Sequence, residues 1–324
     1  MIVTLTVNPS LDRTVELEHA LERGEVQRVA RNVEEPGGKG VNVTRALVAS
    51  GAASVAVLPG RADDPLVVAL TSAGVPVATV PIAARLRSNI TITEPDGVTT
   101  KLNELGPDLS EAEQQALIAA VVAQAADASW LVLAGSLPPS IAPDFYVRVV
   151  REARAAGGVA ARIAVDTSGA PLAALVEAGE PVDLIKPNGE ELAELAGEPD
   201  ADALEADPER VAEVAATLVP RGIRSALVTL GSKGAVLVGE SQGWFAPAPR
   251  IVPRSTVGAG DSSLAGFLLA VTEGAAPERA LAQAVAHGAA AASLPGSAVP
   301  SRVLADASAI TVIRIRGAVA PVIP

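Results

Sequence analysis

The sequence predicts an α/β protein in which helices cover a largely parallel sheet. Short apolar runs rich in valine, leucine and isoleucine alternate along the chain with longer segments of helical pattern, which is typical of consecutive β-α-β units. We expect these strands to begin at Ile2, Ser54, Trp130, Arg162, Val182 and Ser225. At 324 residues, the chain is long enough for one large domain with a covering insertion or for two modest domains.

Helix starts and the end of the chain carry local signals. Ser110 followed by Glu113 is a capping box, and Asp207 before Pro208 is a cap followed by proline at the first helical position. Another helix is expected to begin near Val41, after a glycine-rich turn. The residues from Ile310 onward predict one more strand and a tail.

Two stretches, of about residues 12–35 and 84–104, interrupt the β-α alternation. Within the second, the segments SNITITE and GVTTKLNE alternate in polarity on either side of the turn Pro95-Asp96-Gly97. Such segments predict antiparallel strands. We expect the two stretches to form one small sheet that projects from the main body.

Composition excludes several classes of protein. Apolar residues make up 49% of the chain but aromatics only 2%, so the core is expected to be aliphatic. A net charge of -12 opposes binding to nucleic acid, and no apolar run is long enough to cross a membrane. The chain has no cysteine, and its two histidines, His19 and His287, argue against a histidine zinc site. The first residues resemble a strand more than a signal peptide, so we expect a cytoplasmic protein.

The segment Ser255–Ser263, STVGAGDSS, precedes an apolar helical pattern. Small residues allow close backbone approach, and the N–H groups at a helix start form an anion site. Asp261 would then meet a nucleophilic hydroxyl beside a phosphoryl group. Alternatively, Asp261 is an ordinary helix N-cap.

Three further segments carry polar residues suited to ligand binding. Glu35–Asn42, EPGGKGVN, offers glycines and a lysine to a sugar or phosphate, or is only a flexible turn. Leu184–Glu191 places Asn188 and Glu191 one helical turn apart, where they could hold hydrated magnesium or simply cap and solvate a helix. Thr229–Gly234, TLGSKG, is a strand and turn that could underlie a nucleotide or form only a hairpin.

The chain has 21 arginines but only four lysines, at positions 39, 101, 186 and 233. A compact ammonium and a planar guanidinium are not interchangeable at a tight phosphate site, so each lysine position is informative. On the projecting sheet, Arg28, Arg87 and Lys101 could hold a substrate phosphate. Solvated surface charge is the alternative for each of them.

Six segments, taken together and in their order along the chain, resemble the phosphofructokinase-B branch of the ribokinase-like sugar kinases. They are NPSLD at Asn8, EPGGKGVNVTRAL at Glu35, GSLPPS at Gly135, KPNGEE at Lys186, TLGSKG at Thr229 and STVGAGDS at Ser255. The resemblance covers nearly the whole chain. It implies a single three-layer ribokinase-like α/β domain over residues 1–324, with a mostly parallel central sheet and a small β-sheet lid that is often a dimer interface.

The resemblance also implies ATP-dependent phosphorylation of a sugar hydroxyl, with magnesium required, and assigns a role to each matching residue. Asp261 is the expected base, and Gly258, Ala259 and Gly260 are the backbone donors to the phosphoryl oxygens. The nucleotide is expected at Lys186, Asn188, Thr229, Leu230, Gly231, Ser232, Lys233, Gly234 and Ala289, and magnesium at Asn188 and Glu191. The phosphorylated sugar is expected at Asp12, Arg28, Gly37, Gly38, Lys39, Asn42, Arg87, Ser88, Lys101, Asn103 and Ser136. In some relatives a potassium ion lies at the positions of Ser255 and Val257.

The segment Thr100–Pro107, TKLNELGP, bears on the choice of sugar. It resembles the NEPGP stretch of 1-phosphofructokinases, although Leu105 replaces the first proline. We therefore expect fructose 1-phosphate to be phosphorylated on its 6-hydroxyl, giving fructose 1,6-bisphosphate. The alternative is tagatose 6-phosphate or fructose 6-phosphate phosphorylated on the 1-hydroxyl.

Overall fold

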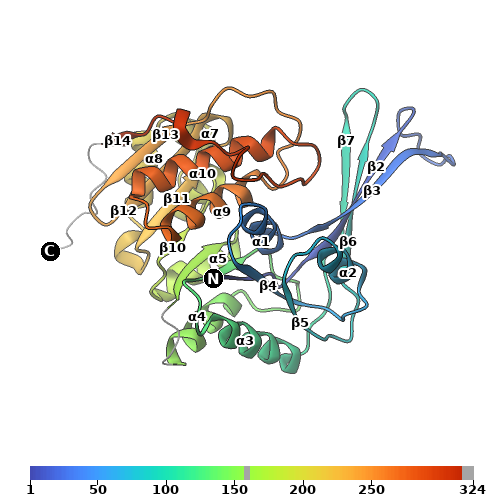
Figure 1. Cartoon of the computed structure of the whole chain (residues 1–324), viewed down its shortest axis with the longest axis horizontal. Coiled ribbons are helices and arrows are strands. Elements are labelled where there is room, and N and C mark those ends of the chain that lie inside the picture. Colours follow the sequence, from blue (N-terminus) through green and yellow to red (C-terminus); the bar gives the residue numbers. More distant parts are fainter. Residues whose placement is uncertain (157–160, 316–324) are drawn as a thin grey trace.

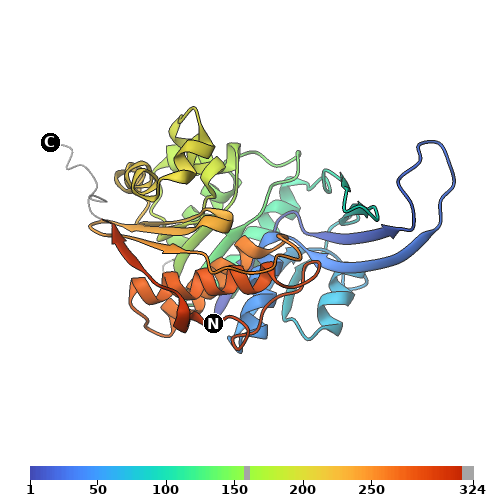
Figure 2. The same cartoon turned by 90° about the horizontal axis from the view of Figure 1, so that it is seen from above.

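The computed structural model describes residues 1–156 and 161–315 and contains two sheets (Figure 1). The larger sheet has ten strands, and a separate sheet of four strands extends from one end of the body. The elongated outline comes from this second sheet, which projects well beyond the helices that cover the first (Figure 2).

The large sheet is parallel over most of its width. Its strands lie in the order β14 (Ile313–Ile315), β13 (Gly243–Pro247), β12 (Gly234–Gly239), β11 (Ser225–Thr229), β10 (Leu184–Ile185), β9 (Arg162–Asp166), β8 (Trp130–Ala134), β1 (Ile2–Leu5), β4 (Ser54–Pro59) and β5 (Val77–Val80). The strands from β11 across to β5 in this spatial order run parallel to one another. Strands β12, β13 and β14 add antiparallel neighbours at one edge. The predicted mostly parallel α/β sheet is confirmed.

The six strands expected from apolar runs are β1, β4, β8, β9, β10 and β11. Strand β10 is the shortest: Val182 joins the sheet only through an isolated bridge, and regular pairing stops before Lys186 and Pro187. Proline cannot donate to the ladder, which ends the strand there. Lys186 therefore emerges at the carboxyl edge of the sheet, beside the end of β9.

Helices cover both faces of this sheet. One face carries α1 (Lys39–Ala49), α2 (Pro65–Ser72), α9 (Ala259–Thr272) and α10 (Pro277–Ala292). The other carries α3 (Glu111–Ala125), α4 (Phe145–Ala155), α5 (Ala170–Ala178), α6 (Gly189–Ala196), α7 (Ala201–Ala206) and α8 (Pro208–Ala216). Three short 3-10 turns, η1 (Val219–Arg221), η2 (Gly231–Lys233) and η3 (Ala307–Ala309), complete the elements.

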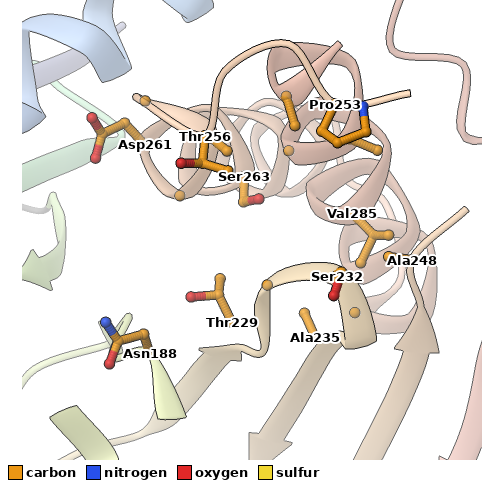
Figure 3. A pocket seen from close by; sticks show the side chains of 18 of the residues that line it. Asn188, Thr229, Ser232, Ala235, Ala248, Pro253, Thr256, Asp261, Ser263 and Val285 are labelled. Atoms are coloured by element: carbon orange, nitrogen blue, oxygen red, sulfur yellow. The ribbon is translucent and has the colours of Figure 1, made fainter. Parts of the chain in front are cut away.

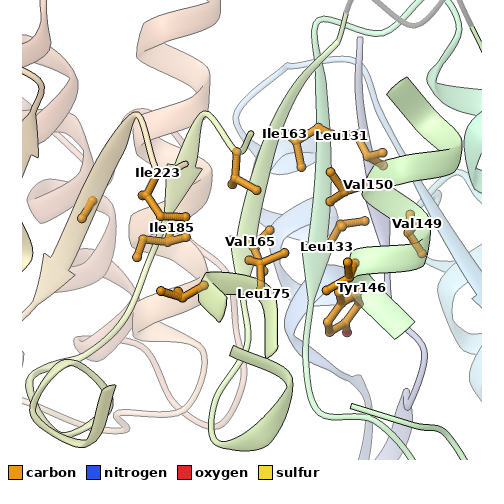
Figure 4. Packing of buried hydrophobic residues seen from close by; sticks show 14 of the residues in the cluster. Leu131, Leu133, Tyr146, Val149, Val150, Ile163, Val165, Leu175, Ile185 and Ile223 are labelled. Carbon is orange, nitrogen blue, oxygen red and sulfur yellow. The ribbon is translucent and has the colours of Figure 1, made fainter. Parts of the chain in front are cut away.

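The core consists of two aliphatic layers separated by the sheet. Along β8, Leu131 and Leu133 point into the layer under α4, whereas Trp130 and Val132 point into the layer under α9 and α10. This alternation follows from the two-residue period of a strand buried on both faces. Figure 4 shows the first layer, with Tyr146 of α4 packed against these strands.

The predicted helix caps are confirmed. Ser110 and Glu113 close a capping box at the start of α3, and the Asp207 side chain accepts from two backbone N–H groups at the start of α8, where Pro208 is the first residue. Helix α1 begins at Lys39, two residues before the expected Val41. Its N-cap, Gly38, has a φ of 115°, a conformation that favours glycine. The helix begins at the next residue, Lys39.

The small sheet, called the lid below, has the order β3 (Val29–Gly37), β2 (Ser10–Leu17), β6 (Arg87–Thr93) and β7 (Thr99–Asn103). The expected antiparallel pair around Pro95-Asp96-Gly97 is confirmed as β6 and β7. Gly97 has a φ of 90° in the turn between them. Register places Ser10, Asp12 and Thr14 beside Arg87, Asn89 and Thr91, on one face of the lid.

At the C-terminal end, β14 confirms the expected last strand, and residues 316–324 of the expected tail lie outside the described residues. No helix among the described residues has the length and apolarity needed to cross a membrane. His287 is fully buried in α10: Nδ1 donates to Gln283 O at 3.0 Å, and Nε2 lies 3.1 Å from Ser50 Oγ. It therefore joins α10 to the end of α1.

Gly266 of α9 packs closely against α10, and we expect Gly266→Ala to destabilise the fold. A Cβ there would lie 2.6 Å from Gln283 O and 2.7 Å from the His287 ring. Overpacking of this kind costs about 1 to 3 kcal/mol, more than the helix propensity that alanine adds. Urea denaturation measures the change. Gly239→Ala is the control, because its Cβ meets only one atom, 3.9 Å away, and the prediction is wrong if both variants unfold at the same midpoint.

Candidate active site

A cavity of about 960 Å³ opens at the carboxyl edge of the large sheet. It lies between the β11–β12 turn and the starts of α6 and α9, and α10 forms its outer wall. Figure 3 shows Asp261 and Asn188 at one end, and Val285, Ala235 and Ala248 at the other. One end is therefore charged and the other apolar, in a volume typical of pockets for small organic ligands.

Asp261 is the third residue of α9 and is buried at 8% exposure. The N-cap of α9 is Gly258, so the alternative prediction that Asp261 is an ordinary N-cap is wrong. The Asp261 carboxylate accepts from Asn42 Nδ2 at 2.8 Å. Burial and the neighbouring Asp166 raise the pKa of Asp261 to about 6, against the opposing effects of Asn42, Lys186 and Lys39. The carboxyl group can therefore exchange a proton near neutral pH.

The first turn of α9 presents backbone N–H groups to the cavity. Gly258 has a φ of 72° and provides no side-chain cap. Ala259 N–H is directed at Thr256 O, 3.3 Å away. Of the three expected backbone donors, Ala259 is therefore already engaged within the chain. A Cβ on Gly260 would lie 3.4 Å from Lys186 Nζ, which places that ammonium beside the helix start. Amides and ammonium together form a site for anionic oxygens.

Asp166 at the end of β9 lies between two lysines. Its Oδ1 accepts from Lys39 Nζ at 2.7 Å, and Lys186 Nζ lies 3.1 Å from Oδ2. Burial alone would raise the pKa of Asp166, but Lys186 and Lys39 hold it below its usual value. Burial alone would likewise lower the pKa of Lys39, and the carboxylates of Asp166 and Glu191 raise it. Asp166 and Lys39 are therefore charged at neutral pH.

Sequence reasoning missed Asp166. The apolar pattern of Arg162–Asp166 predicts only a strand, although the run ends in a carboxylate. Its position was a usable signal, because the carboxyl ends of parallel strands are where α/β proteins bind ligands.

Asn188 and Glu191 form a capping box at the start of α6. Asn188 Oδ1 accepts from Glu191 N at 2.7 Å, and Glu191 Oε2 accepts from Asn188 N at 2.9 Å. The capping alternative is thus confirmed for Asn188, but Glu191 is largely buried instead of solvated, with Oε1 3.8 Å from Lys39 Nζ.

The described residues contain no group of three or more acidic or histidine side chains that could cage a metal. The oxygens of Asn188 and Glu191 nevertheless line the cavity and fit a magnesium ion that keeps most of its ligands as water and phosphate.

The turn Thr229–Gly234 is both the hairpin of the alternative prediction and part of the cavity wall. Thr229 N donates to Pro187 O at 3.0 Å, which sets the turn beside the start of α6. The lining residues predicted here are Thr229, Gly231, Ser232, Gly234 and, across the cavity, Ala289. Leu230 is instead buried in the core, and Lys233 Nζ is directed at Glu205 Oε2, 3.3 Å away.

The base of the lid carries a second polar cluster. Asp12 Oδ1 accepts from Ser10 Oγ at 2.7 Å and from Asn89 Nδ2 at 2.9 Å. A Cβ on Gly37 would overlap the Asp12 carboxylate, so a glycine is required opposite it. Asn103 pairs with Asn89 in the register, which extends this polar face across β7.

Arg87 holds backbone carbonyls together at the base of the lid. Its guanidinium donates to Asn8 O and to Glu104 O, both at 3.1 Å, and its buried Nε has no partner among the described residues. Burial lowers the pKa of Arg87. Beside it, Ser88 N donates to the Glu104 carboxylate at 2.8 Å. Three N–H groups of this corner thus already donate to oxygens of the chain.

The remaining predicted residues lie outside the cavity. Arg28 and Lys101 are exposed on the lid, and Ser136 is exposed after β8. Near the expected potassium site, Val257 N donates to Ser255 Oγ at 3.2 Å, and Ser255 N donates to Ala292 O at 3.3 Å.

Known proteins resemble this chain over nearly its full length. The family model described as pfkB family carbohydrate kinase matches residues 6–303. A 1-phosphofructokinase of Haloferax volcanii is 35% identical over 93% of both chains. The ATP-dependent 6-phosphofructokinase isozyme 2 of Mycobacterium tuberculosis H37Rv is 33% identical over 93% of this chain and 86% of that protein.

A solved structure gives the same result. Phosphofructokinase-2 of Escherichia coli in complex with potassium superposes with a TM-score of 0.84 at 31% identity, covering 94% of this chain and 96% of that one. The predicted family and its ribokinase-like fold are confirmed: the chain belongs to the pfkB family of carbohydrate kinases.

Proposed function

We propose that this protein transfers the γ-phosphoryl group of ATP to the 6-hydroxyl of fructose 1-phosphate, giving fructose 1,6-bisphosphate and ADP. One observation carries the proposal: the Asp261 carboxylate lies at the charged end of the cavity and contacts Asn42, which follows the glycines at the base of the lid. Asp261, the proposed general base, therefore lies between the proposed nucleotide site and the proposed sugar site.

Transfer of the phosphoryl group requires positioning and charge stabilisation more than covalent chemistry by the protein. The sugar oxygen forms a bond to the γ-phosphorus, the bond from that phosphorus to the bridging oxygen breaks, and ADP leaves with the electron pair. Asp261 takes the hydroxyl proton. The amides of Gly258 and Gly260 donate to the oxygens that gain charge, a contact of a kind worth roughly 3 kcal/mol per donor.

The cations at the charged end have separate tasks. Lys186 lies beside Gly260 and can follow the transferred phosphoryl group. Lys39 is anchored by Asp166 and faces Glu191. Asn188 and Glu191 would hold magnesium through water, and the bound ion would neutralise charge on the nucleotide phosphates.

The nucleotide base fits the apolar end of the cavity. Val285, Ala289 and Ala292 line it from α10, and Ala235 lines it from β12. With no aromatic side chain among the lining residues, this end offers apolar contact without ring stacking. Asp12 and Asn89 would bind sugar hydroxyls on the lid face, and Arg87 and Lys101 of that same face would bind the existing phosphate, with Ser88 or Arg28 assisting.

The choice of sugar rests on the resemblance of Thr100–Pro107 to the NEPGP stretch of 1-phosphofructokinases. Strand pairing puts Lys101 of this segment on the lid face that carries Asp12 and Asn89. The alternative is phosphorylation of fructose 6-phosphate or tagatose 6-phosphate on the 1-hydroxyl, with the same cations holding a phosphate at the opposite end of the sugar. The related proteins include phosphofructokinases of both kinds.

We also propose that two chains pair through the lid. The face opposite Asp12 carries the apolar residues Leu11, Val15, Ile90, Ile92 and Leu102, together with the ion pair of Arg13 and Glu34. Leu102 is 54% exposed in the single chain. Sedimentation as a monomer at all micromolar concentrations would contradict this pairing.

A potassium ion near Ser255 and Val257 is proposed as well, and equal activity in potassium and tetramethylammonium salts would exclude it.

A coupled assay of ADP release tests the substrate directly. We expect kcat/KM with fructose 1-phosphate to exceed that with fructose 6-phosphate or tagatose 6-phosphate by at least about tenfold, since only one end of the sugar meets Asp261 when the phosphate is held on the lid. A preference for either 6-phosphate selects the alternative. No ADP release above background with any of the three sugars contradicts the proposed function.

Asp261→Asn is expected to lower kcat by about 10² to 10⁴ while substrate KM values stay within a few-fold, because a base acts in the transition state. In the unchanged protein, the pKa of Asp261 is raised to about 6, so its base form is lost as pH falls through that value. The rate should therefore decline about tenfold per unit below pH 6. Near-normal turnover of the variant would show that another group accepts the proton.

Lys101→Ala is expected to raise the KM for the phosphorylated sugar by tenfold or more and to leave the KM for ATP within about twofold, since a charge-assisted contact to phosphate is lost. Arg13→Ala is the control, because Arg13 lies on the opposite face of the lid and pairs with Glu34. Equal effects of Lys101→Ala on both KM values would exclude the phosphate contact.

A further inference from the structure

Arg45 of α1 lies one helical turn after Asn42 and connects three parts of the chain. Its Nη1 donates to Asn42 Oδ1 at 3.2 Å, to Pro36 O at 3.0 Å and to Ser297 Oγ at 3.2 Å. It therefore touches the side chain that contacts the base, the end of lid strand β3, and the loop after α10.

The guanidinium decides which way the Asn42 carboxamide faces. A guanidinium can only donate hydrogen bonds, so the atom of Asn42 that meets it must be the oxygen. The amide nitrogen is then directed the other way, where it donates to Asp261 Oδ2 at 2.8 Å. Asn42 is only 7% exposed, which leaves water little part in setting this orientation.

We propose that Arg45 is a positioning residue that fixes the Asn42 carboxamide with its donor toward Asp261, and so holds the Asp261 carboxylate in the ionised form and orientation needed to accept the proton of the sugar hydroxyl. The inference rests on the proposed role of Asp261 as the base. Among the described residues, Arg45 has no hydrogen bond to Asp261 and reaches it only through Asn42.

The chemical consequence follows from the two forms of Asp261. The ionised Asp261 carboxylate accepts a hydrogen bond from the Asn42 N–H. A protonated Asp261 would need an acceptor for its O–H at this position, but Asn42 presents a donor. Fixing the amide therefore disfavours the neutral acid. Without Arg45, the carboxamide can rotate and offer its oxygen to a protonated Asp261, which raises the pKa of that carboxyl group.

Other charged groups also act on Asp261. Among the described residues, Asp166 from β9, Lys186 after β10, and Lys39 from α1 influence it directly, and Asn42 bonds to it. A substitution at position 45 leaves Asp166, Lys186 and Lys39 in place and acts on the orientation of Asn42. A change in the pH dependence of turnover after such a substitution is therefore attributable to Asn42 or to the lost positive charge.

A structural role is the competing explanation. Arg45 holds the end of β3, and Glu35 Oε2 of that strand accepts from Ser297 N at 3.2 Å, so the same corner fastens the lid to the body. If fastening were its only task, substitution would weaken binding of the sugar phosphate without moving the acidic limb of the rate profile.

The test measures kcat against pH for Arg45→Met, which keeps the apolar stem and removes the donors. We expect kcat at pH 7 to fall about 10- to 100-fold and the acidic limb to move upward by about one pH unit, with the KM for ATP within about twofold. Arg45→Lys keeps a charged donor and should recover part of the rate. Ser297→Ala removes a different partner of Arg45 and should leave the limb unchanged.

Asn42→Ala gives the decisive comparison. If Arg45 acts through Asn42, adding Arg45→Met to Asn42→Ala produces no further shift of the limb. A shift that persists in the Asn42→Ala background assigns the effect to charge and overturns the inference, as does an unchanged limb in folded Arg45→Met and Arg45→Lys. If the protein without substitutions is inactive with every sugar phosphate, the proposed function itself is rejected instead.

Discussion

The buried ion cluster of Lys39, Asp166 and Lys186 is the interaction on which the site depends. It joins the start of α1 to the ends of β9 and β10, three elements that are distant in sequence. Because Asp166 is fully buried, loss of either lysine would leave a poorly compensated charge, a change that typically costs several kcal/mol. The arrangement of charge at the carboxyl edge is therefore fixed before any ligand binds.

That cluster also determines the environment of Asp261. Asp166 opposes ionisation of Asp261, while Lys186, Lys39 and Asn42 favour it, and burial raises its pKa to about 6. A carboxyl group of this kind is a stronger base than an exposed aspartate and is still ionised at neutral pH. Since its folded pKa lies above the ordinary value, ionised Asp261 costs stability as pH rises through 6, a cost linked to its proposed function.

Sequence patterns predicted the sheet, the lid and several helix starts because those features depend on local periodicity and capping chemistry. They also identified Asp261, Lys39, Lys186, Asn188 and Glu191 as candidates, and the structure brings these five residues to one cavity. They did not reveal Asp166 or Arg45. Both act through contacts between elements far apart in the chain. The position of Asp166 at the carboxyl end of a strand is a usable signal, whereas no local pattern distinguishes Arg45 from a surface cation.

Helix caps explain why the same motifs have two interpretations. At α6, Asn188 and Glu191 accept from each other's backbone N–H groups, so two donors of that helix start already have acceptors. At α9 and α1, the N-caps Gly258 and Gly38 have no capping side chain. Unsatisfied N–H groups then require water or an anion. Around this cavity, α9 and α1 are thus the helix starts best suited to anionic oxygens, while α6 contributes the side-chain oxygens of Asn188 and Glu191, which suit a hydrated cation.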